Sequence, residues 1–559
     1  MTVRKTMYTL SKAVEAIMQD SDLRVTRYKL PRNYEISGPH RTGPGENGAA
    51  YFVPRDAKEE EQRLIRKFGF NMAASNRISF DRSAKDLRDN ECKYWHYPED
   101  LPTASVIIVF HNEPFGTLVR TAHSMINNIP RRLLAEVVLL DDASTRGNLG
   151  EDLENHMRDN YGDLVKIVRT QSVANGRQGL IRARIVGAQH ATRGQVLVFV
   201  DAHCEANPNY YPPLAAPIAQ NRKAVTVPLV DVIDAKTFEY RTQSTFFAQG
   251  GFDWDFNYKR YEVPARERSY HEHKTEPYWS PVMAGGLFAI EKNFFWELGG
   301  YDKGLEVWGA EQYEISFKTW MCGGEILFVP CSRIGHIYRP YVPGYVAYDP
   351  LPGPKLKGIG WGDLNHMRVA EVWMDEYKEY YYISKPFMRN KDCGDLSEMR
   401  QIRKQCNADP NRNSFKWFME NVAYSLTKFY PTPSENVAWG QFECQDENRY
   451  CLDKMGASYG NEIGASHCHG YGGSQLWRIT TGKELRSNEH CISSRGDALI
   501  VVFCHGEKNY FIWVYDKATL QIKHEPSGKC VENTSGTKLG IRPCSGHSSQ
   551  KWKVTPVLL

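Results

Sequence analysis

The chain contains one long apolar run that stops abruptly at polar and small residues, Gln195-Val196-Leu197-Val198-Phe199-Val200-Asp201-Ala202-His203-Cys204. Such a run of β-branched and aromatic residues is typical of a buried parallel strand. Ligands of open α/β sheets bind just beyond the carboxyl ends of the strands, which is where Asp201 and His203 lie. Residues two apart in extended backbone point to the same side, so both side chains can reach one divalent transition metal. A single Asp-x-His sequence is more often a strand end with two solvated polar residues than a metal site. The rest of the chain must therefore distinguish between these two interpretations.

Strands and helices alternate around this run. Helices are expected at Thr117–Ile129 and Gly179–His190, and further strands at Ser105–Phe110, Glu136–Leu140 and Val165–Val168. This order predicts an α/β domain with a doubly wound, mostly parallel sheet. The chain has no Gly-x-Gly-x-x-Gly motif and no Gly-rich loop followed by Lys-Ser/Thr. Its second strand ends in two aspartates instead. An acidic strand end can hold the diphosphate of a nucleotide only through a bridging cation, which favours a metal site at Asp201 and His203.

Two later segments are candidates for contact with a ligand. The small residues of Pro281–Phe288 allow close backbone approach to a ligand, or they form only a turn. Trp308 indicates a stacking surface, and Glu311 opens a helix that should run to about Cys322. The alternative is that Glu311 has no role in a site, because a carboxylate at the start of a helix is stabilised by the helix dipole alone.

A strand at Ile326–Val329 is followed by a histidine and two arginines. His336 is a candidate third metal ligand, and Arg339 is a candidate phosphate clamp. The next segment, 340–363, is rich in Pro, Gly and Tyr without periodicity. A loop of this length inside a domain is usually functional, often as a lid.

Length and composition limit the class of protein. The chain has 559 residues, 41% hydrophobic and 24% charged, with a net charge of +4. This is a soluble multidomain composition with no argument for nucleic-acid binding, and no apolar run reaches the ~20 residues of a membrane span. The N-terminus has no signal-peptide core, so a secretory protein would have lost its targeting segment or would begin at another methionine.

Cysteines concentrate near the end of the chain. Six of the thirteen form three pairs that recur about every 40 residues, Cys451/Cys468, Cys491/Cys504 and Cys530/Cys544. Zinc is the alternative to disulfides, but the chain has no Cys-x-x-Cys. A disulfide framework indicates an oxidising compartment, and the single sequon at Asn533 fits secretion only weakly. Each repeat closes on a tryptophan, so a three-lobed β structure is expected.

These patterns divide the chain into four parts. We expect an irregular stem over 1–58 that packs loosely, the α/β domain over 59–390, a linker over 391–437 and the β domain over 438–559. Further helices are expected at 58–70, 366–382 and 413–422.

The motifs together resemble the polypeptide N-acetylgalactosaminyltransferases, the family that starts mucin-type O-glycosylation. The resemblance covers roughly residues 60–559 and is carried by Phe110–Glu113, Leu140–Ser144, Arg177–Arg182, Asp201–Glu205, Met283–Phe288, Trp308–Glu311, Gly335–Arg339, Cys451–Asp453 and Cys468–Gly470. It implies a GT-A catalytic domain, a ricin-type β-trefoil lectin domain, Mn²⁺ and the donor UDP-GalNAc. It also implies Ser/Thr-rich mucin-like peptide or glycopeptide acceptors, and a type II membrane protein of the Golgi lumen whose anchor is absent from this chain.

The resemblance assigns roles to single residues. It implies Asp201, His203 and His336 as manganese ligands and Glu311 as the active-site carboxylate. Nucleotide contacts fall to Val109, Asp142, Arg177, Ala202, Trp308 and Arg339, with Tyr341 as a stand-in for an aromatic contact. It pairs Cys92 with Cys331 and Cys322 with Cys406, and it makes Cys204 a free thiol beside the site. Cys393 and Cys444 remain and could form a further bridge.

The chain also departs from the family pattern. It has Trp308-Gly309-Ala310-Glu311-Gln312 where the family commonly has Trp-Gly-Gly-Glu-Asn. After Arg339 it lacks the usual His-Pro-Tyr and carries a long insertion.

Family members retain the sugar configuration. A double displacement would need a carboxylate under the anomeric carbon, and the sequence shows none. We therefore expect front-face attack, in which the departing phosphate takes the acceptor proton and Glu311 positions sugar and acceptor.

In the lectin domain the first repeat is the expected GalNAc site. Its candidate residues are Asp453, His469, Tyr471 and Gln475. The second repeat has Ser493 and Phe511 at the corresponding places and should not bind, and the third has Glu532 and Gln550, which leaves its binding doubtful.

Two other functions compete with this interpretation. A catalytically silent GalNAc-binding lectin would not need Asp201, His203, His336 and Glu311. A different metal-dependent GT-A enzyme would not need the trefoil and the Met283–Phe288 segment. The motif His336–Arg339 and the helix around Val369–Tyr377 look closest to family members that prefer glycopeptides.

Overall fold

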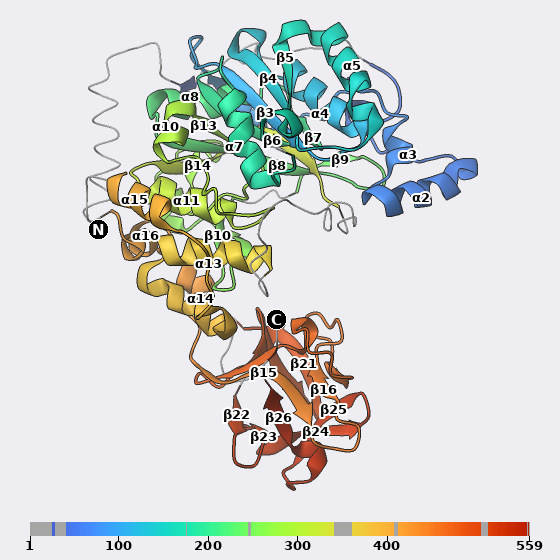
Figure 1. The fold of residues 1–559 in the computed structure, drawn as a ribbon, viewed down its shortest axis with the longest axis vertical. Coiled ribbons are helices and arrows are strands. Elements are labelled where there is room, and N and C mark those ends of the chain that lie inside the picture. Colours follow the sequence, from blue (N-terminus) through green and yellow to red (C-terminus); the bar gives the residue numbers. More distant parts are fainter. Residues whose placement is uncertain are drawn as a thin grey trace.

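The structure is a computed structural model that describes residues 25–27, 41–174, 176–243, 247–339, 360–406, 412–504, 512–555 and 557. A large α/β part is followed by a smaller, all-β part that lies below it in Figure 1. In the part of the chain that the structure describes, no helix is both long and apolar enough to cross a bilayer.

The main sheet has the strand order β12-β14-β8-β13-β6-β3-β4-β5. Its parallel half consists of β3 (Ala104–Phe110), β4 (Leu134–Asp141), β5 (Val165–Arg169) and β6 (Val196–Asp201). All four were expected from their apolar runs, and β3 and β4 are almost entirely buried because helices cover both faces. The chain order reverses between β3 and β6, so their carboxyl ends form the switch point at which such sheets bind ligands.

The other half of the sheet is mixed. β13 (Phe288–Glu291) runs antiparallel between β6 and β8 (Ala224–Ile233), whereas β14 (Glu325–Ile337) is parallel to β8. Strand β14 continues far beyond the expected end at Val329, through a register shift between Val329 and Arg333. It continues because its second half pairs with β8 on one side and with β7 (Cys204–Ala206) on the other. A pairing between segments so far apart in the chain leaves no local trace in the sequence.

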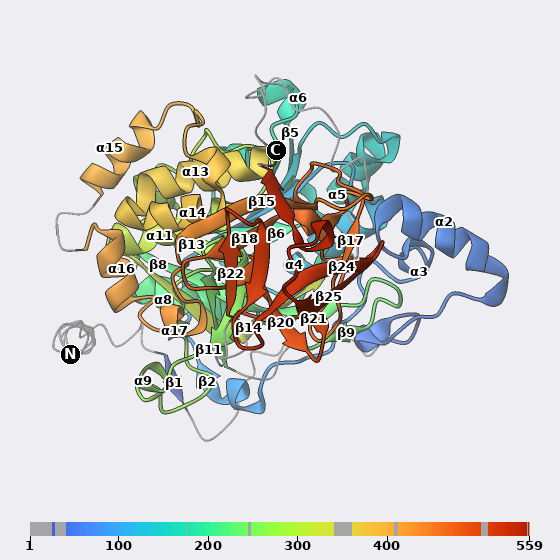
Figure 2. The same cartoon turned by 90° about the horizontal axis from the view of Figure 1, so that it is seen from below.

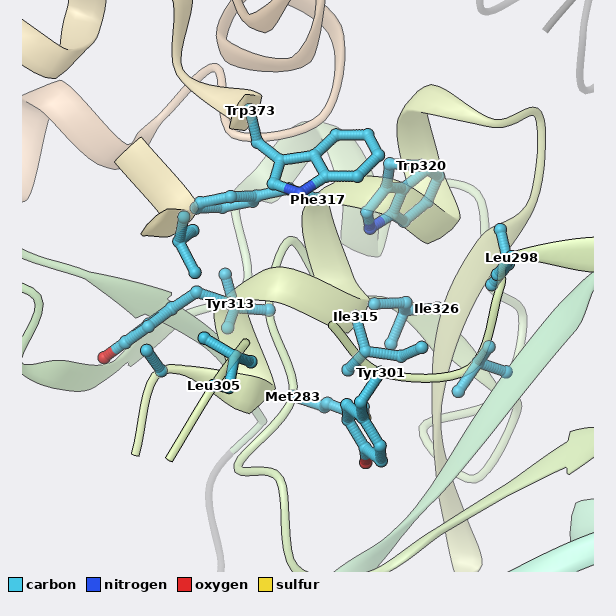
Figure 3. Close-up of a cluster of buried hydrophobic side chains, with 14 of the residues drawn as sticks. Met283, Leu298, Tyr301, Leu305, Tyr313, Ile315, Phe317, Trp320, Ile326 and Trp373 are labelled. Carbon is cyan, nitrogen blue, oxygen red and sulfur yellow. The ribbon is translucent and has the colours of Figure 1, made fainter. Parts of the chain in front are cut away.

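Helices pack on both faces of the sheet (Figure 1). They include α4 (Phe115–Asn127), α5 (Glu151–Tyr161), α7 (Leu180–His190) and α8 (Tyr211–Gln220). Helix α11 (Glu311–Met321) is buried over nearly its whole length. Figure 3 shows Tyr313, Ile315, Phe317 and Trp320 of this helix in the apolar cluster that holds it.

The single helix expected at 366–382 is two helices, α13 (Trp361–Trp373) and α14 (Lys378–Ser384). They are separated at Asp375, whose φ is 47°. The Asp375 carboxylate accepts the backbone N–H of Phe415 at 2.8 Å and pairs with Arg403 at 2.8 Å. These tertiary bonds stabilise the break, and they hold α16 (Phe415–Asn421), the helix expected near 413–422.

Part of the described N-terminal region is packed against the main sheet. Helices α2 (Lys58–Phe68) and α3 (Met72–Ser75) share a buried cluster with Val53, Phe238 and Ile337. A Cβ on Gly48 would lie 2.7 Å from the Cβ of Tyr240. The expectation of a loosely packed stem over 1–58 is therefore wrong at Gly48 and Val53, which are buried, while most of the described residues 41–58 are exposed.

The all-β part is a trefoil with three equivalent anchors, seen from below in Figure 2. The indole N–H groups of Trp477, Trp513 and Trp552 donate to the carbonyls of Leu452, Ile492 and Val531 at 2.8, 2.7 and 3.0 Å. Each acceptor directly follows the first cysteine of its repeat. The strands are β15 (Asn436–Cys444), β16 (Cys451–Asp453), β17 (Gly464–Ser466), β18 (Trp477–Thr480), β19 (Leu485–Ser487), β20 (His490–Arg495), β21 (Ala498–Phe503), β22 (Trp513–Asp516), β23 (Gln521–His524), β24 (Lys529–Ser535), β25 (Lys538–Pro543) and β26 (Trp552–Thr555).

Five disulfides join the cysteines in the expected pairs: Cys92–Cys331, Cys322–Cys406, Cys451–Cys468, Cys491–Cys504 and Cys530–Cys544. The trefoil cysteines are therefore not zinc ligands. Cys204, Cys393 and Cys444 are buried free thiols, so the additional Cys393–Cys444 bridge is wrong.

Candidate functional site

The switch point between β3 and β6 gathers most of the predicted site residues. Val109 is the register partner of Asp201, and both are followed by polar side chains at the same edge. His336 Nε2 lies 3.5 Å from Asp201 Oδ2, and the imidazole rings of His203 and His336 are 4.7 Å apart. Strand β14 and the backbone bond from Ile337 N to His203 O bring these two histidines together.

Glu113 joins this group from the end of β3. Its carboxylate accepts two bonds from Arg339, both 2.8 Å, and lies 3.4 Å from His203 Nδ1. The Arg339 guanidinium also lies over the Phe70 ring, 5.1 Å from its centroid. Burial raises the pKa of Glu113, but the charges of Arg339 and His203 outweigh it and lower the pKa to about 2. Arg339 is therefore held by a carboxylate at the place where a phosphate clamp was expected.

The residues predicted to bind Mn²⁺ fit that ion by their chemistry. A carboxylate and two imidazoles suit a divalent transition metal. Among the described residues, the Nδ1 atom of His336 is buried without a hydrogen-bond partner, and that of His203 faces only the Glu113 carboxylate, 3.4 Å away. Within the described ranges, however, no three His, Cys, Asp or Glu side chains already converge on one metal position. The ligand set Asp201, His203 and His336 therefore remains a prediction, supported by proximity and donor type.

The charge around Asp201 is set by its partners. Arg184 Nη2 donates to Asp201 Oδ1 at 3.0 Å. Burial raises the pKa of Asp201, but the hydrogen bond from His336 and the charge of Arg184 lower it below its ordinary value, so the carboxylate is ionised. A Cβ on Gly286 would lie 2.5 Å from Asp201 Oδ2. The small residues of Met283–Phe288 therefore make room for this carboxylate.

Glu311 lies on the other side of the same arginine. Arg184 Nη1 is 3.4 Å from Glu311 Oε1, and the backbone N–H of Gly309 donates to Glu311 Oε2 at 2.7 Å. The side chains of Arg184 and Glu311 are 3% and 4% exposed, so water screens this contact little. Burial raises the pKa of Glu311, and the charge of Arg184 opposes it.

The backbone before Glu311 is strained. Val307 and Ala310 have φ values of 53° and 71°, in the left-handed region that β-branched residues rarely enter. Asn112 and Ala143, just after β3 and β4, also have positive φ values of 50° and 57°. Such outliers persist where the surrounding structure imposes them, and they often gather at functional sites. All four flank the switch point or Glu311.

Asp142 binds backbone at the end of β4. Its carboxylate accepts the N–H groups of Gln178 and Gly179 at 2.6 and 2.8 Å, and Arg177 Nε lies 3.9 Å away. Burial raises its pKa, which these bonds oppose. Asp142 therefore orders the Arg177–Gly179 turn, and a nucleotide contact through Asp142 and Arg177 remains a prediction.

The remaining predicted nucleotide contacts differ in exposure. Val109 and Ala202 are buried, so they can offer a ligand only backbone or a small face. Trp308 is 57% exposed, and its ring meets Trp361 edge-on at 6.4 Å. Tyr341 and most of the expected lid, 340–359, lie outside the described residues.

Sequence reasoning did not single out Glu113 or Arg184. A signal existed for Glu113, because it follows β3 at the same edge as Asp201. None existed for Arg184, which lies in the middle of α7 and reaches two carboxylates only through packing.

The predicted sugar site of the trefoil is assembled around Gln475. Its side-chain amide donates to Asp453 Oδ2 at 3.0 Å, and its Oε1 accepts the backbone N–H of His469 at 3.1 Å. Tyr471 is 80% exposed, and its ring stacks on His469 at 5.8 Å. Exposed aromatic faces beside acceptor oxygens suit a sugar ring.

The third repeat has the same bond pattern, with Gln550 donating to Glu532 at 2.6 Å. Ser493 of the second repeat is buried, and Phe511 lies outside the described residues.

Comparison with known families assigns both parts of the chain. Residues 105–299 match glycosyl transferase family 2, and residues 438–552 match the ricin-type beta-trefoil lectin domain. Residues 268–342 match a model described as the N-terminal domain of galactosyltransferase. These ranges contain Asp201, His336 and Glu311 in the first part and Asp453 in the second.

Relatives match over nearly the whole chain. N-acetylgalactosaminyltransferase 7 of Rattus norvegicus is 45% identical over 536 residues, 95% of this chain and 79% of the relative. Polypeptide N-acetylgalactosaminyltransferase 10 of Homo sapiens is 40% identical over 530 residues, 92% of this chain and 83% of the relative. A solved structure of GalNAc-T7 with UDP, GalNAc and Mn²⁺ superposes with a TM-score of 0.85 at 42% identity, covering 96% of this chain and 97% of that one. The chain therefore belongs to the polypeptide N-acetylgalactosaminyltransferase family and is a glycosyltransferase with a lectin domain.

Proposed function

We propose that this enzyme transfers GalNAc from UDP-GalNAc to Ser/Thr hydroxyls of mucin-like peptides or glycopeptides, with Mn²⁺ held by Asp201, His203 and His336. One observation carries the proposal. The three candidate ligands and Glu311 meet at the switch point, where Arg184 contacts Asp201 and Glu311 at 3.0 and 3.4 Å. The relatives named above support the donor and the ion.

Asp201, His203 and His336 would hold the ion, which would supply charge neutralisation at the diphosphate. The protein residues supply position. Arg184 and the Gly309 N–H hold the Glu311 carboxylate in one orientation, which allows it to accept a hydrogen bond from a sugar or acceptor hydroxyl. The exposed Trp308 ring offers an apolar face to the departing nucleotide, and Arg339, which Glu113 holds by two hydrogen bonds, lies at the same edge of the sheet.

Retention of configuration follows from the same geometry in our proposal. Glu311 is tied to Arg184 and to backbone, so it is placed to orient groups rather than to leave its position as a nucleophile. The acceptor hydroxyl then attacks from the face that UDP leaves, and its proton passes to the leaving phosphate oxygen.

The lectin domain would bind GalNAc already present on the acceptor, through Asp453, His469, Tyr471 and Gln475. The sugar ring would stack on the exposed face of Tyr471, beside Asp453, whose carboxylate accepts hydrogen bonds from Ser466 and Gln475. We further propose that the enzyme works in the Golgi lumen, which the five disulfides support because they require an oxidising compartment. The four parts proposed from the sequence, 1–58, 59–390, 391–437 and 438–559, remain our domain division.

The test is UDP-GalNAc transfer to a Thr-containing mucin peptide and to a matched glycopeptide, with and without Mn²⁺. We expect manganese-dependent transfer that His203→Ala reduces by at least about 100-fold, since both metal affinity and phosphate neutralisation suffer. Asp453→Ala should leave transfer to the bare peptide intact and remove only the advantage of the glycopeptide.

Sugar binding without transfer to either acceptor would instead support a catalytically silent lectin. Transfer from a different nucleotide sugar would support another metal-dependent glycosyltransferase.

A further inference from the structure

A pocket lies at the outer edge of the main sheet, away from the switch point. It encloses about 400 Å³ beside the first half of β14, where β12 (Tyr278–Trp279) is the outermost strand. Leu327 of β14 lines it, nine residues before His336, which places it roughly 30 Å from the candidate metal ligands. The pocket is therefore separate from the site described above.

Segments that are distant in the sequence form the walls of this pocket. They are α8, α9 (Ala265–Arg268) with the chain that follows it to β12, the first half of β14, and the chain around the paired short strands β1 (Thr26–Arg27) and β2 (Trp95–His96). Figure 2 shows α9, β1 and β2 next to one another. The disulfide Cys92–Cys331 ties the chain before β2 to β14, so this wall is fixed to the sheet by a covalent bond.

The pocket combines aromatic rings with carboxylates. Its rings belong to Trp95, Tyr97, Tyr270 and Trp279. Its carboxylates belong to Glu267, Glu276 and Glu325. Among the described residues that line it, none is a lysine or an arginine. Aromatic faces and carboxylates both attract positive charge, so this lining favours an organic cation. We call it the aromatic–acidic pocket.

Two indole rings of the aromatic–acidic pocket are held in fixed orientations. Trp95 Nε1 donates to Thr275 Oγ1 and Trp279 Nε1 donates to Glu325 Oε2, both at 2.8 Å. Rings that are already ordered lose little conformational freedom when a ligand stacks on them. The two indoles therefore offer a preformed surface to a ligand.

Two of the carboxylates have no lysine or arginine partner in the described part of the chain. Glu325 accepts one hydrogen bond from an indole N–H and one, at 2.7 Å, from Asn221 Nδ2, and both donors are uncharged. Glu276 accepts the backbone N–H of His273 at 3.1 Å and lies 3.3 Å from His271 Nδ1. Like charges that share one pocket repel one another, and a bound cation would relieve this repulsion.

We propose that the aromatic–acidic pocket binds an organic cation, and that the group it takes is the guanidinium of an arginine side chain in a polypeptide. A guanidinium is planar, stacks on aromatic faces and donates two parallel hydrogen bonds to a carboxylate, whereas an ammonium is a compact point charge. The volume lies in the range of small-ligand pockets, about 300–1,000 Å³, so it has room for a whole side chain. Free arginine brings its own carboxylate, which the acidic lining repels, and an arginine within a polypeptide does not.

Two other ligands fit the aromatic–acidic pocket less well. A metal ion needs several ligands around one position, and within the described ranges no three His, Cys, Asp or Glu side chains provide one. A neutral sugar could stack on the rings, but it would leave the carboxylates of Glu276 and Glu325 without a counter-charge. The charge of the lining therefore favours a cation over a sugar.

The binding is tested by calorimetric titration of the full chain with a blocked arginine, N-acetyl-arginine N-methylamide. We expect saturable binding with a Kd on the order of 0.1–1 mM, as for a ligand of this size. The citrulline analogue has the same shape without the charge and should bind at least about tenfold more weakly. The lysine analogue should bind with an affinity between the two, because its ammonium cannot stack as a plane.

Variants of the lining test where the arginine binds. Glu276→Gln and Glu325→Gln keep the size of each side chain and one acceptor oxygen, and together they should weaken binding at least about tenfold. Trp279→Leu removes an aromatic face and should weaken it about tenfold. Glu297→Gln is the matched control, since Glu297 is an exposed carboxylate outside the pocket that pairs with Lys223. Thermal unfolding of each variant shows whether the fold is retained.

No binding of blocked arginine, equal binding of the citrulline analogue, or unchanged binding in the double variant would overturn the proposal. Displacement of the arginine by free GalNAc would also overturn it, because the pocket would then be a sugar site. Tighter binding of choline than of blocked arginine would overturn the choice of a guanidinium. The titration contains neither UDP-GalNAc nor Mn²⁺, so its result does not depend on the proposed function.

Discussion

Arg184 offers the sharpest test of how the active site is built. Its guanidinium lies between two carboxylates, 3.0 Å from Asp201 and 3.4 Å from Glu311, with its own side chain 3% exposed. Arg184→Met keeps most of the volume and removes the charge. Two carboxylates then face each other with no cation from the protein, and Asp201 retains only the nearby imidazoles.

The expected cost follows from burial. Removing one partner of a buried ion pair leaves an uncompensated charge and costs about 3–5 kcal/mol. Asp201 is 21% exposed, so the lower end of that range is expected. Glu311 also loses the group that orients it, and the transfer rate should fall by roughly 100- to 1,000-fold, the usual effect of losing one positioned polar group.

The assay combines calorimetry with transfer kinetics. Unfolding of the catalytic domain should shift to lower temperature in Arg184→Met, while the trefoil transition serves as an internal reference. Arg184→Lys should recover part of the stability but little of the rate, because an ammonium cannot contact both carboxylates as a fork does. Arg158→Met is the matched control, since the Arg158 side chain is 66% exposed and its pair contributes little. A loss below about 1 kcal/mol in Arg184→Met would refute the assignment of Arg184 as the group that holds this site together.

Two further predictions concern positions near the site. Burial lowers the pKa of His366 to about 3, so the unfolded chain binds its proton between pH 6.5 and 3 and the folded protein does not. Stability should therefore fall as pH drops, by about 2 kcal/mol from pH 7.5 to 5, and His366→Phe should flatten this slope in denaturant titrations; an unchanged slope would contradict the assignment. Gly286→Ala should weaken Mn²⁺-dependent transfer, because its Cβ would lie 2.5 Å from Asp201 Oδ2, whereas Gly147→Ala, with no atom within 4 Å of its new Cβ, should not. Equal manganese dependence in both variants would show that Asp201 can move without loss of Mn²⁺-dependent transfer.

Local patterns were enough to predict the central part of the fold. The apolar runs of β3, β4, β5 and β6 identify these strands, because a strand buried on both faces needs apolar side chains throughout. The same pattern locates Asp201 and His203 at a carboxyl end. The three cysteine pairs with their closing tryptophans identify the trefoil, since each repeat carries its own anchor.

Other features depend on partners that are distant in the chain. His336 lies inside β14 rather than after it, because β7 pairs with the strand beyond the bulge. The break at Asp375 is held by Arg403 and by the Phe415 backbone. Nothing in the local sequence of either segment shows these contacts.

The sequence by itself determined which residues end the central parallel strands β3, β4, β5 and β6 and which repeats build the trefoil, because both follow from periodicity and spacing within short segments. Only the tertiary structure decided that Arg184 joins Asp201 to Glu311 and that Lys259 meets Glu489, 230 residues away. Ion pairs between side chains on different elements depend on how those elements pack, and packing is a property of the whole folded chain.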